Sequence, residues 1–346
     1  MMKKELIECI PNISYGLNDN MLHSIVQNLN KIQGQKLIHM DSNEGANRTV
    51  LTLVGNRTGI RNALLSLFQI TSQNIDMRKH QGAHPRIGMV DVCPIVPLQG
   101  ISLKETLDFT RSLSQEIAEQ FNIPIYSYEH SQDQSYRKHL PQIRKGGYEG
   151  LIEKMKKPEW KPDFGPLPNS EENILAIQKY GATVLGVRPI LIAYNVSIKT
   201  DNTKIAQQLA HEIRSIGDGK GNRGAFEALR AIGWYIPEFE HAQISMNFLN
   251  YKITSPLEVY DNLKEKCKSL NIEVIGSELV GLIPQEVIVK AGEKMAKKLD
   301  RTELNTDQLI PLGIDYLQLN AIKPFNPELH ILEKVIKNVM NIELSL

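Results

Sequence analysis

The chain has 346 residues, of which 41% are hydrophobic and 23% charged, and its formal net charge is +1. This is the composition of an ordinary globular protein, and the length favours two domains. The small net charge gives no overall field that would favour binding to nucleic acid or to an anionic membrane. Three widely spaced cysteines predict neither a disulfide framework nor a cysteine metal site. The N-terminus is charged where a signal peptide is apolar, and no apolar run would span a bilayer, so we expect a cytoplasmic protein.

The first half of the sequence alternates between strand-like and helix-like patterns. The expected elements are a strand at Leu6–Ile10, a helix at Asn20–Leu29, strands at Lys36–Met40 and Thr49–Val54, a helix at Thr58–Ile70 and a strand at Ile87–Val96. This βαββαβ order predicts an antiparallel sheet with both helices on one face. A further helix at Leu103–Gln120 and a strand at Ile123–Tyr128 extend it.

The second half repeats this order of patterns. The expected elements are a strand at Pro189–Ile198, a helix at Thr203–Ile216, strands at Leu229–Ile236 and Ala242–Ile253, a helix at Pro256–Leu270 and a strand at Ile272–Leu279. After them we expect a helix at Gln285–Lys298, a turn-rich stretch, and a last amphipathic helix from Pro327. The predicted fold class is therefore α+β, with two ferredoxin-like (βαββαβ) subdomains.

A polar segment separates the two halves. Residues 149–187 are rich in Lys, Pro, Gly and Asn, which fits a crossover between domains. We place the domains at residues 1–187 and 188–346, with the C-terminal helices in the second. A ligand crevice is expected between them, because such crevices are frequent ligand sites.

The stretch Asp76–Pro97 joins a polar loop to an apolar strand. Its histidines, His80 and His84, could perform chemistry on a rigid scaffold, or could belong to a solvated basic loop. Their i, i+4 spacing would suit two metal ligands on a helix, but Gly82 and Pro85 disfavour a helix, so we expect no metal. General acid–base catalysis suits His84 better, because an imidazole both accepts and donates a proton near neutral pH. Gly82 would let the loop approach another segment closely.

A carboxylate that orients the imidazole would complete such a site, and Asp41 is a candidate. It ends one predicted strand before the turn that leads to Asn47, and elements adjacent in sequence often lie close in space. The alternative is turn chemistry, because Asp and Asn stabilise turns through their own side chains. The residues alone favour that alternative.

Arginines at predicted strand ends and in loops form a separate group. They are Arg48, Arg78, Arg86, Arg137, Arg144 and Arg188. A guanidinium binds a carboxylate through two parallel hydrogen bonds, so two of these arginines would suit a small dicarboxylate substrate. Salt bridges within the fold are an equally good interpretation.

The stretch 217–224 is rich in glycine. It lies between a predicted helix and a predicted strand, the wrong order for a loop that binds phosphate at a helix N-terminus. A flexible helix exit is the better interpretation, although Lys220, Arg223 and Arg230 could meet a polyanionic tail.

A series of motifs runs in order through nearly the whole chain. In the first half these are Glu8-Cys9-Ile10-Pro11-Asn12-Ile13-Ser14, Asn47-Arg48-Thr49-Val50, Asp76-Met77, His84-Pro85-Arg86 and Asp91-Val92-Cys93-Pro94. The series continues with Trp160, Pro162-Asp163-Phe164-Gly165-Pro166, Gly181-Ala182-Thr183, Ala231-Ile232-Gly233-Trp234-Tyr235 and Gly276-Ser277-Glu278-Leu279-Val280-Gly281-Leu282. Together they closely resemble the glutamate formimidoyltransferase family, the formiminotransferase part of formimidoyltransferase-cyclodeaminase.

This resemblance implies a fold of two ferredoxin-like subdomains and a specific reaction. The formimino group of N-formimidoyl-L-glutamate would move to N5 of tetrahydrofolate, giving 5-formimidoyltetrahydrofolate and L-glutamate in histidine degradation. Tetrahydrofolate is then a co-substrate, no metal takes part, and a homodimer is expected.

The resemblance also implies roles for individual residues. The family's catalytic histidine, which precedes Pro-Arg, maps onto His84, and its assisting aspartate maps onto Asp41. The folate-binding residues map onto Asp163, Phe164, Gly165, Pro166, Tyr180 and Gly181. We further expect Arg48 and Arg86 to bind the carboxylates of glutamate.

Two other functions stay open at this point. Formyl transfer between 5-formyltetrahydrofolate and glutamate could use the same pocket. A non-catalytic folate-binding subunit is an alternative of another class. The presence of His84 with Asp41 speaks against it, because pterin binding alone needs no acid–base pair.

Overall fold

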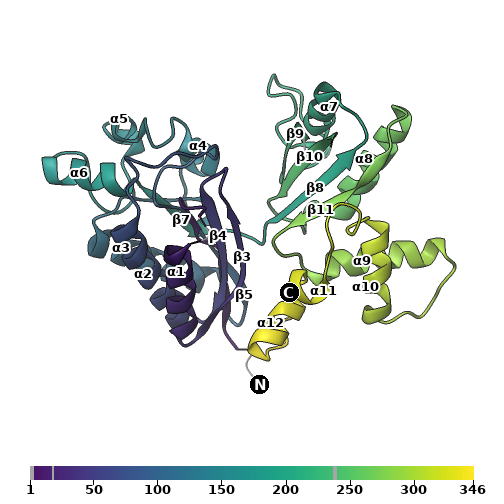
Figure 1. Cartoon of the computed structure of the whole chain (residues 1–346), viewed down its shortest axis with the longest axis horizontal. Helices are drawn as coiled ribbons and strands as arrows, with labels where there is room; N and C mark the ends of the chain where they lie inside the picture. Colours follow the sequence, from purple (N-terminus) through teal and green to yellow (C-terminus); the bar gives the residue numbers. More distant parts are fainter. Residues whose placement is uncertain (1–3, 18, 237–239) are drawn as a thin grey trace. The chain divides into compact units, whose positions relative to one another are not determined.

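The computed structural model describes residues 4–17, 19–236 and 240–346, which divide into two compact units (Figure 1). Unit 1 comprises Met1–Arg188 together with Leu344–Leu346, and unit 2 comprises Pro189–Glu343. Both units combine helices with a β-sheet, so the chain is α+β as predicted. Within the described part of the chain, no helix has both the length and the apolar character needed to cross a membrane.

Unit 1 is built on a seven-stranded sheet. Its strands are β1 (Leu6–Cys9), β2 (Asn12–Ile13), β3 (Gln35–Asn43), β4 (Arg48–Gly55), β5 (Val90–Gln99), β6 (Ile125–Ser127) and β7 (Thr183–Val187). Their order is β1-β4-β2-β5-β7-β6, with β3 paired to β4 and β1 also paired to β5. The pairs among β1 to β5 are antiparallel, whereas β7 runs parallel to both β5 and β6.

Three capped helices cover one face of this sheet. They are α1 (Asn20–Lys31), α2 (Arg57–Asn74) and α3 (Leu103–Phe121), and Figure 1 shows them on the same side of the strands. Their N-caps are Asp19, Asn56 and Ser102, whose side chains accept hydrogen bonds from backbone N–H groups of the first turn. Alternate strand residues such as Ile7 and Leu53 pack with apolar helix residues such as Phe68 in one buried core.

The opposite face of the sheet is partly covered by the segment predicted as a crossover. That segment, residues 149–187, contains α5 (Leu151–Met155), a 3₁₀ turn at Pro158–Trp160 and α6 (Glu171–Tyr180). Just before it lie 3₁₀ turns at Glu129–Ser131 and Ser135–Arg137 and the short helix α4 (Leu140–Arg144). The interpretation of residues 149–187 as a polar connection is therefore wrong in part. Its last five residues form the buried strand β7, which lies between β5 and β6 in the sheet.

One glycine of this segment allows a close backbone approach. Gly181 has φ +71°, and a Cβ there would lie 2.1 Å from the carbonyl oxygen of Ile87. We expect Gly181→Ala to lower the free energy of unfolding by about 1–3 kcal/mol, because the added methyl group would both clash and strain the backbone. Urea unfolding measures this. Gly281→Ala is the control, because φ is +85° there but no atom lies within 4 Å. Equal losses in both variants would contradict the role of the clash.

Unit 2 has a four-stranded antiparallel sheet in the order β11-β8-β10-β9. Its elements are β8 (Ile192–Ile198), α7 (Thr203–Ile213), β9 (Leu229–Ile236), β10 (His241–Phe248), α8 (Pro256–Ser269) and β11 (Val274–Val280). The predicted βαββαβ order is observed here. A capping box between Ser255 and Glu258 starts α8, and inward strand residues such as Tyr194 and Phe248 form the core with the helices.

The end of unit 2 holds one helix that the sequence analysis missed. Its elements are α9 (Gln285–Lys298), α10 (Thr306–Tyr316), α11 (Pro327–His330) and α12 (Leu332–Met340). The sequence predicts a turn-rich stretch here, whereas the structure has α10, with Pro311 and Gly313 inside the helix. A capping box between Asn305 and Gln308 starts this helix. Gly313 lets α10 pack closely on Ile288 of α9.

Candidate active site

The loop that leads into β5 is tied to the turn between β3 and β4. Asn47 donates from Nδ2 to the carbonyl oxygen of Gln81 at 2.7 Å. A Cβ at Gly82 would lie 2.5 Å from the carbonyl oxygen of Ala46, so the close approach expected of this glycine is confirmed. The loop is thus held against the end of a strand pair.

The imidazole of His84 is oriented by a backbone carbonyl group. Its Nδ1 lies 2.7 Å from the carbonyl oxygen of Pro85. Because a carbonyl oxygen only accepts, Nδ1 must carry the proton, and Nε2 then keeps its lone pair when the ring is neutral. His84 therefore presents a proton acceptor whose tautomer is fixed by its own neighbour.

His80 differs from His84, because hydrogen bonds within the loop use both of its ring nitrogens. Nδ1 accepts from Nε of Arg86 at 3.1 Å, so Nε2 carries the proton and donates to the carbonyl oxygen of Asn47 at 3.1 Å. Arg86 is itself paired with Glu149 through both terminal nitrogens, at 2.8 and 3.1 Å. Among the described residues, this leaves His80 no ring nitrogen for a substrate.

A buried carboxylate lies next to His84 and holds two arginines. Asp91 is fully buried at the start of β5 and accepts from Arg48 Nη1 at 2.9 Å and from Arg144 Nε at 3.3 Å and Nη2. It also accepts from the backbone N–H of Ile87 at 2.9 Å. The strand predicted from Ile87 begins three residues later, at Val90.

Burial and two nearby arginines favour the neutral form of His84. Burial is the largest cause that lowers its pKa, to about 4, and the positive charges of Arg48 and Arg144 lower it further. The hydrogen bond to Pro85 and the charge of Asp91 oppose this shift. At neutral pH the ring is therefore unprotonated at Nε2 and able to accept a proton.

Asp41 lies on the same face of the sheet as Arg48. It pairs with Val50, and Asn43, two residues further, pairs with Arg48, so the alternation of side chains brings Asp41 and Arg48 to one face. Asp41 is exposed, and across residues 4–17, 19–236 and 240–346 it forms neither a hydrogen bond nor an ion pair with His84. Its assistance to His84 stays a prediction.

The first part of the predicted folate segment packs along β6. Asp163 accepts from the backbone N–H of Ser127 at 2.8 Å and from Arg137 Nη2 at 2.6 Å. Phe164 forms a β-bridge with Ile125, and Gly165 follows with φ +91°. Pro166 comes next. The carboxylate of Asp163 has structural partners in this arrangement.

The second part of the predicted folate segment lies beside the loop that carries His84. The backbone N–H of Met89 donates to the carbonyl oxygen of Tyr180 at 2.9 Å, and Gly181 forms a β-bridge with Gly88. The structure therefore brings Tyr180 and Gly181 to the end of this loop. It ties residues 163–166 to a different strand, and a role of either part in folate binding stays a prediction.

Two residues organise this cluster, Asp91 and Arg144, and sequence patterns alone do not single them out. Arg144 was one of six arginines placed in loops, and Asp91 appeared only within a motif. One signal was available, because a lone acidic residue inside the apolar run Ile87–Val96 needs hydrogen-bond partners when it is buried. This pattern indicates that Asp91 needs a hydrogen-bond partner, but it does not identify Arg48 or Arg144 as that partner.

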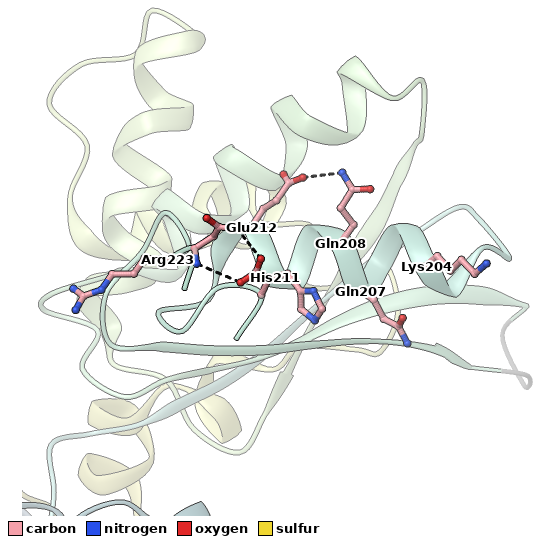
Figure 2. A pocket seen from close by; sticks show the side chains of 8 residues that line it. Lys204, Gln207, Gln208, His211, Glu212 and Arg223 are labelled. Carbon is pink, nitrogen blue, oxygen red and sulfur yellow. Dashed lines mark hydrogen bonds between the residues drawn. The ribbon is translucent and has the colours of Figure 1, made fainter. Parts of the chain in front are cut away.

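A hollow of about 420 Å³ lies in unit 2, between α7 and the glycine-rich stretch (Figure 2). Figure 2 shows Lys204 and Arg223 extending in opposite directions from it. Its acidic groups have partners, since Asp218 accepts from Asn222 Nδ2 at 2.8 Å and Glu212 accepts from Gln208 Nε2 at 2.9 Å. Cationic groups do not converge here, so the hollow is a weaker candidate than the site at His84.

The described residues contain no group of three or more His, Cys, Asp or Glu side chains placed to hold a metal ion. A reaction without metal stays an expectation. The chemistry that the site at His84 supports is proton transfer beside a positively charged cluster.

Comparison with known protein families gives two matches in tandem. A family model described as the N-terminal subdomain of the formiminotransferase domain matches residues 6–188, and a model described as the formiminotransferase domain matches residues 193–337.

Individual proteins are similar to the chain over most of its length. Formimidoyltransferase-cyclodeaminase from Dictyostelium discoideum is 36% identical over 98% of this chain and 62% of that protein. Glutamate formimidoyltransferase from Streptococcus pyogenes is 35% identical over 84% of this chain and 92% of that protein. The enzyme of the same name from Thermoplasma acidophilum is 29% identical over 98% and 99%, respectively. The chain thus spans about three fifths of the length of the Dictyostelium relative.

Proposed function

Because this chain belongs to the formiminotransferase domain family, we propose that it transfers the formimino group of N-formimidoyl-L-glutamate to N5 of tetrahydrofolate. The products are 5-formimidoyltetrahydrofolate and L-glutamate, and the reaction belongs to histidine degradation. Two relatives named glutamate formimidoyltransferase support this proposal, and the chain covers more than nine tenths of each. The observation that carries it is the neutral imidazole of His84, whose Nε2 has no hydrogen-bond partner among the described residues.

The reaction needs one group that both takes and gives a proton. A bond forms between N5 and the formimino carbon while the bond from that carbon to the glutamate nitrogen breaks. His84 Nε2 takes the proton that N5 must lose and returns it to the departing nitrogen, which leaves poorly as an anion. The hydrogen bond to the carbonyl group of Pro85 keeps the ring in one orientation through both steps.

The remaining expectations belong to the same proposal. A ferredoxin-like topology of both units is supported by the strand orders β3-β4-β1-β5 and β11-β8-β10-β9. The ligand crevice between the units, the homodimer and the cytoplasmic location rest on the family and on the sequence. Asp41 would assist His84 from its exposed position on β3. Tetrahydrofolate would bind through the segments at 163–166 and 180–181.

The two arginines expected to bind glutamate carboxylates have different environments. Arg86 is neutralised by Glu149 and donates to His80, so a substrate would have to replace an existing ion pair. Arg48 shares its acidic partner with a second arginine and keeps positive charge available. Arg48 is therefore the stronger candidate of the two.

A transfer assay with three arms tests the proposed function. The purified chain is incubated with N-formimidoyl-L-glutamate and tetrahydrofolate, with 5-formyltetrahydrofolate and glutamate, and with tetrahydrofolate alone. Chromatography then identifies the folate products, and calorimetry measures folate binding. We expect turnover in the first arm. Turnover in the second arm alone would indicate formyl transfer, and binding without turnover would indicate a non-catalytic folate-binding subunit.

The pH dependence of kcat/KM follows from the neutral state of His84. A proton acceptor must be unprotonated, and His84 loses this form only as the pH falls toward about 4. We therefore expect no loss of kcat/KM from this group between about pH 5 and pH 8, after correction for ionisation of the free substrates. An enzyme limb near the ordinary histidine pKa of about 6.5 would contradict the lowered value.

A further inference from the structure

The pair of arginines on Asp91 is an unusual arrangement of charge. Elsewhere in the described chain, five arginines each face one carboxylate of their own: Arg57 with Glu5, Arg61 with Glu116, Arg78 with Asp76, Arg86 with Glu149 and Arg137 with Asp163. Asp91 instead neutralises only one of the two positive charges of Arg48 and Arg144. Buried charges in proteins are normally paired, so the extra positive charge calls for an anion.

The two guanidinium groups still have donors to offer. Arg48 uses Nη1 and Nη2, and Arg144 uses Nε and Nη2. Arg48 Nε and Arg144 Nη1 have no hydrogen-bond partner among residues 4–17, 19–236 and 240–346. The side chains keep 14% and 13% of their surface exposed, so a small anion can reach them.

The cluster is also held rigidly. Asn12 accepts from Arg48 Nη2 through Oδ1 at 2.6 Å, and its own Nδ2 donates to the carbonyl oxygen of Ile10 at 2.7 Å, which fixes the amide. Asp91 holds Arg144 through two donors and is itself fixed by a backbone N–H. Donors that are already oriented bind an anion at a lower entropic cost than mobile ones.

We propose that Arg48 and Arg144, positioned together by Asp91, bind the α-carboxylate of the amino-acid donor beside His84. This inference rests on the proposed function. In N-formimidoyl-L-glutamate the nitrogen that receives the proton is bonded to the carbon that carries the α-carboxylate, so the two groups are at most a few ångströms apart. The glutamate of folate is separated from N5 by its aminobenzoyl group. A carboxylate site next to His84 therefore suits the donor.

This site would also link binding to proton transfer. The groups that face His84 are Arg48 from β4, Arg144 from α4, Asp91 from β5 and the carbonyl group of Pro85. Burial, together with the two arginines, keeps the ring neutral before the donor arrives. A bound carboxylate offsets their excess charge, so the imidazolium that forms during transfer is better tolerated. The pKa of His84 should then rise when the donor or its product binds.

The variant Arg144→Gln separates binding of the donor's α-carboxylate from binding of tetrahydrofolate. We expect it to raise the KM for N-formimidoyl-L-glutamate and the Kd for L-glutamate by about tenfold to a hundredfold, the loss typical of a charge-assisted hydrogen bond. The KM for tetrahydrofolate should stay unchanged. Arg144→Lys keeps the charge but not the fork of donors, and we expect an intermediate effect. Arg61→Gln is the matched control, because Arg61 of α2 pairs with Glu116 of α3 at the surface, and it should behave as the wild type.

Calorimetry with L-glutamate keeps this test independent of turnover. γ-Aminobutyrate lacks the α-carboxylate, so it should bind the wild type and both Arg144 variants equally weakly. A rise in the KM for tetrahydrofolate instead of the donor would assign the arginines to the folate tail and overturn the proposal. Unchanged glutamate affinity in both Arg144 variants would also overturn it. Absence of transfer by the wild type with intact glutamate binding would count against the proposed function alone.

The ring signals of His84 give a readout that a merely structural role would not move. NMR of histidine-labelled protein should show the His84 titration shifting to higher pH when L-glutamate is added. In Arg144→Gln the pKa of His84 without ligand should be higher than in the wild type, and L-glutamate should raise it less. If L-glutamate does not change the pKa of His84 in the wild type, the link between the arginines and His84 is contradicted.

Discussion

Replacement of His84 by alanine should lower kcat for formimino transfer by about two to four orders of magnitude, the usual contribution of a general acid–base group. The ring is half-buried in a loop whose anchoring contacts come from other residues, so the fold should survive its loss. Without Nε2, no described side chain takes its place at this position. Steady-state kinetics and circular dichroism measure the two effects separately.

The comparison of histidine variants tests this assignment. His23 is an exposed residue of α1, and His23→Ala should leave kcat unchanged. His84→Ala should also retain tetrahydrofolate binding, because the substitution removes a proton acceptor and leaves the backbone in place. Near-normal turnover in His84→Ala would end the assignment of His84 as the acid–base group.

Replacement of Asp91 by alanine should produce a larger loss of stability than Gly181→Ala or Asp108→Ala. Its carboxylate is fully buried and satisfies Arg48, Arg144 and the backbone N–H of Ile87. Its removal leaves two nearly buried guanidinium groups facing each other without a counter-charge. We expect the free energy of unfolding to fall by about 3–5 kcal/mol, as is typical when one partner of a buried ion pair is removed.

Urea unfolding of matched variants checks this expectation. Asp91→Asn keeps the shape and one acceptor, so the difference between it and Asp91→Ala separates the charge from the hydrogen bond to Ile87. Asp108→Ala is the surface control, because its ion pair with Lys104 is exposed and should be worth at most about 1 kcal/mol. A loss at Asp91 as small as that at Asp108 would show that the cluster is not held by this carboxylate.

Local hydrophobic periodicity predicts those helices and strands whose apolar pattern lies within their own residues. The strand Leu229–Ile236 and the helix Gln285–Lys298 have the predicted limits. Two of the elements that the sequence did not predict owe their stability to distant neighbours. The helix Thr306–Tyr316 contains proline and glycine, and it forms where that glycine packs on α9. The strand Thr183–Val187 is short and gains its hydrogen bonds from β5 and β6.

The site shows a similar division. The sequence selects His84 from its motif, but it assigns the orienting role to a carboxylate, whereas the structure gives the carbonyl group of Pro85 as its partner. The pairing of Asp91 with Arg144 joins residues 53 positions apart, and no spacing rule connects them. The sequence identifies a group of arginines at strand ends and in loops. Only the structure shows that two of them, Arg48 and Arg144, share one carboxylate and so carry excess positive charge.

Isotopic labelling tests most directly whether a whole formimino group is transferred. The donor carries ¹³C and ¹⁵N in the formimino group, and mass spectrometry follows both labels after incubation with tetrahydrofolate. We expect both labels in the folate product, unlabelled L-glutamate in equal amount, and loss of the signal in His84→Ala. Release of the ¹⁵N label as ammonia, or labels that never reach the folate, would contradict formimino transfer by this chain.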